Sequence, residues 1–470
     1  MLTSATLLSL LAGTAVAETV HGVVVFTRHG DRTTKHYGAQ SLTSLGATQN
    51  FQVGSDYRVR YLAAGSPHQI AGISESKYIS SQIYATAPNS GILLNTATAF
   101  LQGLYPPLVD LAPASQILSN GTKSTSPLNG YQYVTLQGVK DNSPDTIWIK
   151  GDESCPTLDA SLSALESSPH FTSLVASTRP FYESFYPALQ SVSSIRSPSS
   201  LSFASAYDIF DLLNVARIHN TSTTASISDA NFFQLRTLAD AAEFAHSYDA
   251  ADAARSTGAR TFAGAVLAQL TKTVTSAGAL KFSLLAGSYD TFLGFAGLAD
   301  LTAASADFFG LPEYASTMAF ELFSAAGGST GVLSKDDLHV RFLFRNGTEG
   351  ALTAFPLFGG KEESLGWAEF EREMQARAIT TVEGWCSACR SEVDFCKVYG
   401  EVGAKKEGGM STAVAGVVGA AVTLGVVALV GGFVFMMVRR RGSRGEKGGI
   451  PAQRLGEKGS VRSFTSEVTV

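Results

Sequence analysis

The sequence predicts an α/β fold with a mostly parallel sheet flanked by helices, an inserted α-helical cap and one C-terminal transmembrane helix. Three observations support this prediction. Short β-branched runs alternate with segments of helical periodicity, as expected when helices join the strands of a sheet. The stretch from about 120 to 265 shows mainly helical periodicity. An uncharged apolar run, 413–438, follows near the C-terminus.

The composition limits the classes of function. The chain has 470 residues, of which 45% are hydrophobic and 16% are charged. A chain of this length buries a large core without a metal or a disulfide scaffold. The 35 basic and 40 acidic residues give a formal net charge of −5. Because there is no overall basic excess, we expect no nucleic-acid partner.

Residues 1–17 have the features of a secretory signal peptide. A short apolar region ends in Ala15-Val16-Ala17, which resembles an A-x-A cleavage site. A buried N-terminal helix is the alternative. It is disfavoured because small residues end the run, which is also too short to span a membrane.

The following segment, 18–408, is the predicted ectodomain, in which strands and helices alternate. Apolar and β-branched runs predict strands at 20–27, 82–85 and 281–286, and on both sides of a turn at 346–347. Helical spacing predicts helices at 44–62 and 94–104, and within the cap at 158–165, 180–192, 206–215 and 232–254.

Residues 413–438 are predicted to form a single transmembrane helix. At about 1.5 Å per residue, this run exceeds the roughly 30 Å hydrocarbon core of a bilayer. Three arginines follow at once, which places the basic tail, 439–470, in the cytoplasm and the ectodomain outside. A glycolipid anchor is disfavoured because a mostly polar tail follows the apolar run. We therefore expect a single-pass type I membrane protein of the secretory pathway or cell surface.

Two further features are typical of an exported chain. Asn120, Asn220 and Asn346 are predicted glycosylation sites, because each has Ser or Thr two residues later. The even number of cysteines predicts two disulfides with three possible pairings. A redox or zinc site at the C-x-x-C pair is the alternative, but zinc needs a fourth ligand that the local sequence lacks. The four cysteines are Cys155, Cys386, Cys389 and Cys396.

Candidate chemistry is concentrated where the first strand ends, in Arg28-His29-Gly30-Asp31-Arg32. In open α/β sheets, ligands bind beyond the C-terminal ends of strands. Two guanidinium groups beside an imidazole suit a tetrahedral anion, and their charge keeps the imidazole unprotonated. His29 is then a candidate nucleophile toward phosphorus. A basic surface loop that contains a histidine is the alternative, which the position after a buried strand disfavours.

This segment resembles the Arg-His-Gly-x-Arg-x-Pro signature of the histidine acid phosphatases, a family that includes phytases and prostatic-type acid phosphatases. Further segments are similar to family landmarks, and the cysteine-rich end resembles fungal members, here in a membrane-anchored form. The resemblance covers most of residues 20–400 and implies the phosphoglycerate-mutase-like histidine phosphatase fold with its inserted cap. The similar segments are Leu42–Tyr61, Phe100–Pro107, Phe282–Thr291 and Trp385–Cys396.

The resemblance implies a phosphomonoesterase mechanism. His29 would form a phosphohistidine, Arg28 and Arg32 would bind the phosphoryl oxygens, and Asp290 would protonate the leaving group. The expected partner is a phosphomonoester substrate. No metal and no cofactor are implied, because the arginines would stabilise the developing charge.

The sequence departs from the family pattern at several positions. Thr34 replaces the signature proline, and Tyr289 replaces the histidine of the His-Asp pair, with a hydroxyl that can donate one hydrogen bond to phosphate. Thr86 and Ile92 stand where further arginines are expected, and 82–104 contains no Arg or Lys. Each missing donor typically costs on the order of 10² to 10³ in rate.

Two hypotheses from different classes follow. The first is an extracytoplasmic acid phosphatase that hydrolyses phosphomonoesters, with a small monoester favoured over phytate because cations are missing. The second is a catalytically impaired surface protein that keeps the phosphatase fold as a binding module. The complete Arg28–Arg32 segment favours the first hypothesis, whereas the missing Arg and His favour the second. A mutase on this scaffold is disfavoured, because that class is usually cytosolic.

Overall fold

The computed structural model describes residues 18–325 and 333–399. The predicted signal peptide, transmembrane helix and basic tail lie outside these residues. Within them, no helix is long and apolar enough to cross a membrane.

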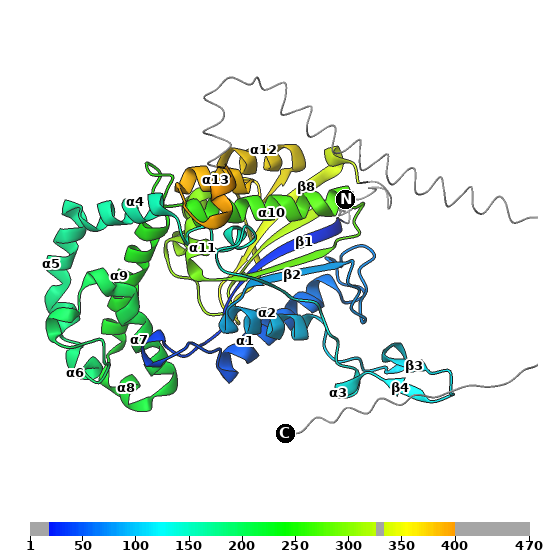
Figure 1. Cartoon of the computed structure of the whole chain (residues 1–470), viewed down its shortest axis with the longest axis horizontal. Helices are drawn as coiled ribbons and strands as arrows, with labels where there is room; N and C mark the ends of the chain where they lie inside the picture. Colours follow the sequence, from blue (N-terminus) through cyan, green and yellow to red (C-terminus); the bar gives the residue numbers. More distant parts are fainter. Residues whose placement is uncertain (1–17, 326–332, 400–470) are drawn as a thin grey trace, which may run out of the picture. The chain divides into compact units, whose positions relative to one another are not determined.

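A mixed sheet of eight strands organises the described part of the chain, in the order β10-β8-β7-β1-β6-β2-β5 with β9 beside β8 (Figure 1). Its parallel half contains β1 (Thr19–Arg28), β6 (Phe282–Gly287), β2 (Ile83–Pro88) and β5 (Gln137–Val139). Its antiparallel half contains β7 (Thr317–Ser324), β8 (Leu338–Arg345), β9 (Thr353–Phe355) and β10 (Ser364–Gly366).

The prediction of a mostly parallel sheet is therefore wrong for the second half of the sheet. Strands that follow one another through short connections pair antiparallel, whereas parallel pairs need a longer crossover. The connection from β8 to β9 includes the predicted turn, where Gly347 has a φ of 75°. The strands predicted at 20–27, 82–85 and 281–286 are confirmed as β1, β2 and β6.

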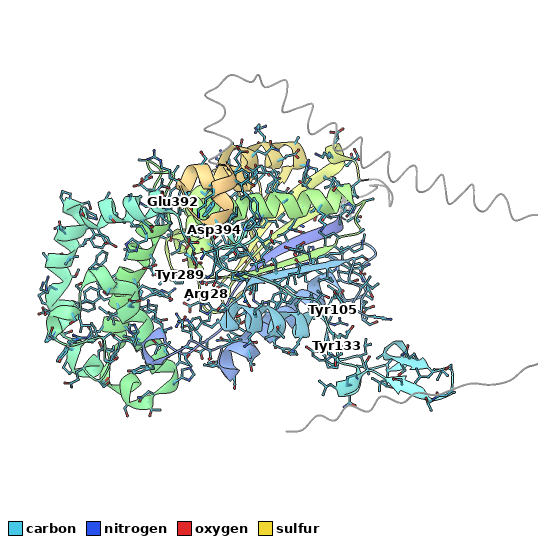
Figure 2. The ribbon with its side chains drawn as sticks, viewed as in Figure 1. Arg28, Tyr105, Tyr133, Tyr289, Glu392 and Asp394 are labelled. Atoms are coloured by element: carbon cyan, nitrogen blue, oxygen red, sulfur yellow. A yellow bond between two sulfur atoms is a disulfide. The ribbon has the colours of Figure 1, made fainter. Side chains whose placement is uncertain are left out.

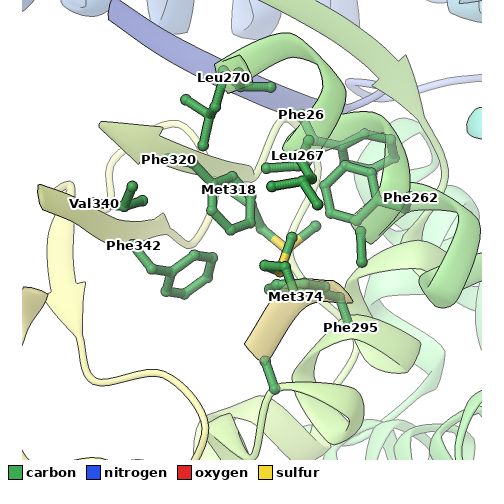
Figure 3. Close-up of a cluster of buried hydrophobic side chains, with 14 of the residues drawn as sticks. Phe26, Phe262, Leu267, Leu270, Phe295, Met318, Phe320, Val340, Phe342 and Met374 are labelled. Atoms are coloured by element: carbon green, nitrogen blue, oxygen red, sulfur yellow. The ribbon is translucent and has the colours of Figure 1, made fainter. Parts of the chain in front are cut away.

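Helices cover both faces of the sheet (Figure 1). α1 (Ser44–Tyr61) and α2 (Gly91–Leu104) pack on one face, and α10 (Thr257–Thr275), α11 (Tyr289–Leu298) and α12 (Trp367–Arg377) pack on the other. Because successive side chains of a strand alternate between faces, Val23 and Val25 of β1 join the first core, and Val24 and Phe26 join the second. Figure 3 shows Phe26 beside Phe262 in that second core.

A group of helices between 156 and 247 has a hydrophobic core of its own, which also includes Leu293 and Leu311. This group lies inside the predicted cap range of about 120–265. α10 belongs to the sheet layer, and residues 120–155 form short strands, turns and short helical segments. The cap helices are α4 (Pro156–Glu166), α5 (Pro169–Glu183), α6 (Tyr186–Leu189), α7 (Ala206–His219), α8 (Thr221–Ser226) and α9 (Asp229–Ser247). The smaller elements are β3 (Ser115–Ile117), β4 (Lys123–Thr125) and α3 (Pro127–Gly130).

The two predicted disulfides are present. Cys155 is bonded to Cys389 and Cys386 to Cys396, which is one of the three possible pairings. The first bond ties the start of α4 to the end of α13 (Val382–Cys389), two segments separated by 234 residues. This disulfide therefore links the segment that leads into the cap covalently to the C-terminal part of the described chain.

Candidate active site

The end of β1 brings Arg28 and His29 to the edge of the sheet. Gly30 then lets the chain pass close to α1, since a Cβ at this position would lie 2.3 Å from the carbonyl oxygen of Gly46. Asn50 of α1 holds the turn on both sides. Its Oδ1 accepts from the Gly30 amide at 2.7 Å, and its Nδ2 donates to the Arg28 carbonyl at 3.1 Å. The backbone that carries His29 is thus fixed by α1.

His29 is buried and oriented by its own backbone. Its Nδ1 lies 2.8 Å from the carbonyl oxygen of Gly30. A carbonyl only accepts, so Nδ1 carries the proton and Nε2 keeps its lone pair. Burial and the charges of Arg28 and Arg32 hold the pKa of His29 well below its usual 6.5. The imidazole is therefore neutral, with Nε2 as its nucleophilic atom.

A cavity of about 310 Å³ brings four of the predicted site residues together. They are His29, Arg32, Tyr289 and Asp290. Arg28 lies beside this group rather than in the cavity wall. Its guanidinium carbon is 5.4 Å from the centre of the Tyr289 ring, and Figure 2 shows the two side chains close together.

Arg28 is held by neutral groups. Its guanidinium donates to the Pro312 carbonyl and lies over the Tyr314 ring, 4.8 Å from the ring centre. Its buried Nε has no hydrogen-bond partner in the described part of the chain. An unpartnered cationic donor of this kind is costly to bury, and a bound anion would satisfy it.

Asp290 lies in the first turn of α11 and lines the cavity. Burial, with the negative charges of Asp152 and Glu243, raises the pKa of Asp290 to about 8. Asp152 lines the same cavity, and burial also raises its pKa. Asp290 therefore holds a proton at acid and neutral pH, as a general acid requires.

The cap contributes side chains that the sequence did not mark as functional. The Tyr289 hydroxyl donates to Glu243 of α9 at 2.8 Å, and its ring lies 4.4 Å from that of Tyr207 of α7. This hydroxyl, predicted to donate to phosphate, is directed at a carboxylate instead. Arg32 likewise donates to Asp211 of α7 at 3.0 Å. No signal in the sequence could have found Asp211, because it lies 179 residues from its partner.

A metal site is not formed by these groups. In the described ranges, no three His, Cys, Asp or Glu side chains gather as a metal ion would require. Asp152, Glu153 and Asp290 share the cavity wall without forming such a cluster.

Comparisons with known proteins identify the family. The family model described as histidine phosphatase superfamily (branch 2) matches residues 34–345. The chain belongs to this family. The match begins just after Arg32, so the placement of His29 in the site rests on the geometry given above.

Solved structures of two phytases and an inositol polyphosphate phosphatase are similar to this chain at low sequence identity. Phytase from Klebsiella sp. ASR1 is 12% identical, with a TM-score of 0.50 over 77% of this chain and 96% of that chain. Phytase from Citrobacter braakii is 12% identical, with a TM-score of 0.49 over 77% and 98%. Multiple inositol polyphosphate phosphatase from Bifidobacterium longum is 11% identical, with a TM-score of 0.47 over 79% and 96%. None of the curated protein sequences compared with this chain matched it.

In this histidine phosphatase, the two expected arginine positions carry no charge. Thr86 lies near the C-terminal end of β2, and its hydroxyl donates to the Gln137 carbonyl at 3.2 Å. Ile92, in the first turn of α2, lines the cavity with an apolar side chain. The other cations in the wall, Lys35 and Lys150, are each paired with a carboxylate, at 2.5 and 2.6 Å.

Proposed function

We propose that this chain is an extracytoplasmic acid phosphatase that hydrolyses small phosphomonoesters through a phosphohistidine on His29. One observation carries the proposal. The neutral imidazole of His29, with Nε2 unprotonated, shares a 310 Å³ cavity with a carboxylic acid, Asp290, that stays protonated at acid and neutral pH. These are the nucleophile and the proton donor that ester cleavage requires.

The reaction proceeds in two displacements. Nε2 of His29 attacks phosphorus, the bond from phosphorus to the ester oxygen breaks, and that oxygen takes the proton of Asp290. Water then attacks the phosphohistidine and gives its proton to the Asp290 carboxylate. The bond from phosphorus to nitrogen breaks, which releases phosphate and restores neutral His29. Arg28 and Arg32 would stabilise the phosphoryl charge in both steps.

We expect the acidic groups of the cavity to favour activity at acid pH. Asp152 and Glu153 line the wall beside Asp290. Burial raises the pKa of Asp152 to about 6. When ionised, Asp152 repels a phosphate dianion, and its protonation removes that repulsion. His29 stays neutral into the acid range because its pKa is lowered. Acid conditions therefore favour substrate binding and the proton donor without disabling the nucleophile.

The cavity also favours a small monoester over phytate. Ile92 and Thr86 add no positive charge where the family pattern has arginines, and Lys35 is already paired with Asp208. A hexaphosphate would bring many charges into a site with few unpaired cations. We therefore propose a small monoester, and not phytate, as the substrate of this chain.

Export is supported by three features. Residues 1–17 predict a signal peptide, the two disulfides suit an oxidising compartment, and all three predicted glycosylation sites are exposed. The proposed topology keeps the predicted single-pass helix at 413–438 with the basic tail in the cytoplasm.

The second candidate is a binding module on the phosphatase fold. The ion pair between Arg32 and Asp211 favours this candidate, because it leaves Arg32 less available to bind a phosphoryl group during catalysis. This candidate predicts phosphate binding without phosphate release.

The test is phosphate release from an aryl phosphomonoester by the full chain, expressed through a secretory route, between about pH 3 and 7. We expect His29→Ala to reduce release to background. His36→Ala is the matched control, because His36 is on the adjoining loop and bonds to Ser194 outside the cavity. Equal release by wild type and His29→Ala would refute the enzyme and leave the binding module.

A further inference from the structure

Cap helix α7 makes a series of charged and polar contacts with the loop at 31–35. In the proposed function, the loop residues that make these contacts lie at or next to the phosphate site. The contacts are Lys35 with Asp208 at 2.5 Å, Arg32 with Asp211 at 3.0 Å, and Asp31 with His219 at 2.8 Å.

The middle contact is the most buried of the three. The side chains of Arg32 and Asp211 are 6% and 4% exposed. Arg32 also donates to the Tyr207 hydroxyl at 3.4 Å and to the Thr33 carbonyl at 3.3 Å. The same guanidinium lines the cavity that contains His29. The group that would bind phosphate therefore already holds an anion from the protein.

Arg28 differs from Arg32 in this respect. Across 18–325 and 333–399 no carboxylate forms an ion pair with Arg28, which donates to the Pro312 carbonyl and keeps Nε unpartnered. The cap thus neutralises one signature arginine and leaves the other available. Asp211 accepts from Nη1 of Arg32, so a phosphate dianion that binds this nitrogen competes with the carboxylate, and the two charges repel each other when both are near the guanidinium.

We propose that Asp211 is an internal competitor for phosphate. In the free protein its carboxylate holds Arg32, and the phosphoryl group of a substrate binds by displacing that carboxylate from the guanidinium. This inference rests on the proposed function in taking the His29 cavity as the phosphate site. It makes Asp211 a residue of α7 that sets the affinity of the site for a phosphoryl group.

The opposite role would be positioning, in which Asp211 orients Arg32 toward phosphate. Asp211→Asn separates the two roles, because asparagine keeps the size and one acceptor oxygen but removes the charge. A competitor predicts tighter phosphate binding by this variant. A positioning residue predicts weaker or unchanged binding.

The experiment is calorimetric titration of the full chain with inorganic phosphate. We expect Asp211→Asn to lower the Kd for phosphate about tenfold, the order expected when a like charge is removed beside a bound anion. Adding Arg32→Gln to Asp211→Asn should abolish the gain, since the freed guanidinium is its source. Asp229→Asn is the matched control, because it removes a carboxylate from an exposed cap pair with Arg217 and should leave the Kd unchanged.

Thermal unfolding establishes that each variant is folded, and Asp211→Ser carries the same expectation where Asp211→Asn does not fold. Unchanged or weaker phosphate binding by the folded charge-neutral variant overturns the inference. Absence of binding by both wild type and variant also overturns it, because removal of the competitor would then uncover no site. The proposed function is judged separately, by loss of phosphate release in His29→Ala, which does not depend on Asp211.

Discussion

Nδ1 of His29 lies 2.8 Å from the carbonyl oxygen of Gly30, the next residue in the chain. This contact fixes the tautomer, because the carbonyl accepts the Nδ1 proton and leaves Nε2 with its lone pair. The contact depends on the backbone turn after β1, and that turn depends on the close approach of Gly30 to α1. The nucleophile is therefore prepared by local backbone geometry before any substrate binds.

The close packing of Gly30 leads to a prediction on stability. Gly30→Ala would place a Cβ 2.3 Å from the Gly46 carbonyl oxygen, so α1 or the turn has to move. We expect a loss of about 2 kcal/mol or more in the free energy of unfolding, measured by denaturant titration, together with loss of activity. Gly91→Ala is the control, since a Cβ there meets nothing within 4 Å. Equal stability of the two variants would show that Gly30 is not packed as described.

Asp290 should matter most for poor leaving groups. An alkyl phosphate needs a proton on its departing oxygen, whereas a nitrophenyl phosphate leaves with little assistance. We expect Asp290→Asn to lower kcat by on the order of 10² to 10³ for an alkyl monoester and by about tenfold or less for the nitrophenyl ester. Equal losses for both substrates would assign Asp290 a role other than proton donor.

The pH profile follows from the acidic groups of the cavity. Asp290 donates its proton only below its pKa, which burial and Asp152 raise to about 8. The activity should therefore be present at acid pH and fall as the pH rises through that value. Asp152→Asn removes one of the charges that raise this pKa, so the basic limb should move to lower pH. A basic limb that stays in place in kcat profiles at saturating substrate, where substrate repulsion by Asp152 no longer contributes, would contradict the coupling.

The disulfides should differ in their contribution to stability. The bond from Cys155 to Cys389 spans 234 residues, whereas that from Cys386 to Cys396 spans 10. A longer closed loop loses more entropy in the unfolded chain. Replacement of the first pair by serines should cost about 5–6 kcal/mol of unfolding free energy and that of the second about 2–3 kcal/mol. A reversed order in denaturant titrations would contradict this account.

The sequence predicted the elements whose pattern is local. The β-branched run that forms β1 and the turn at Asn346-Gly347 both appear in the structure as expected. The antiparallel strands β7 and β10 were missed, because direction depends on which strands pair and periodicity does not report pairing. The chemistry at the end of β1 was predicted for the same local reason, since Arg28 to Arg32 are contiguous.

The rest of the site depends on contacts between distant segments. Asp152, Asp211 and Glu243 come from loops and cap helices that fold back over the sheet, and nothing in their local sequence distinguishes them from solvated acidic residues. Their effect is electrostatic and arises only from burial beside His29, Arg32 and Asp290. Only the folded structure, in which the cap helices pack against the core, identifies these residues as part of the site.

The central claim is that His29 carries the phosphoryl group during turnover. The most direct measurement is rapid mixing with a ³²P-labelled phosphomonoester, quenching in alkali, in which phosphohistidine survives, and mapping of the labelled residue. The account predicts label on His29 in the wild type, no label in His29→Ala, and full labelling in the His36→Ala control. Phosphate release by the wild type with no label on the protein, or with label on another residue, would contradict it.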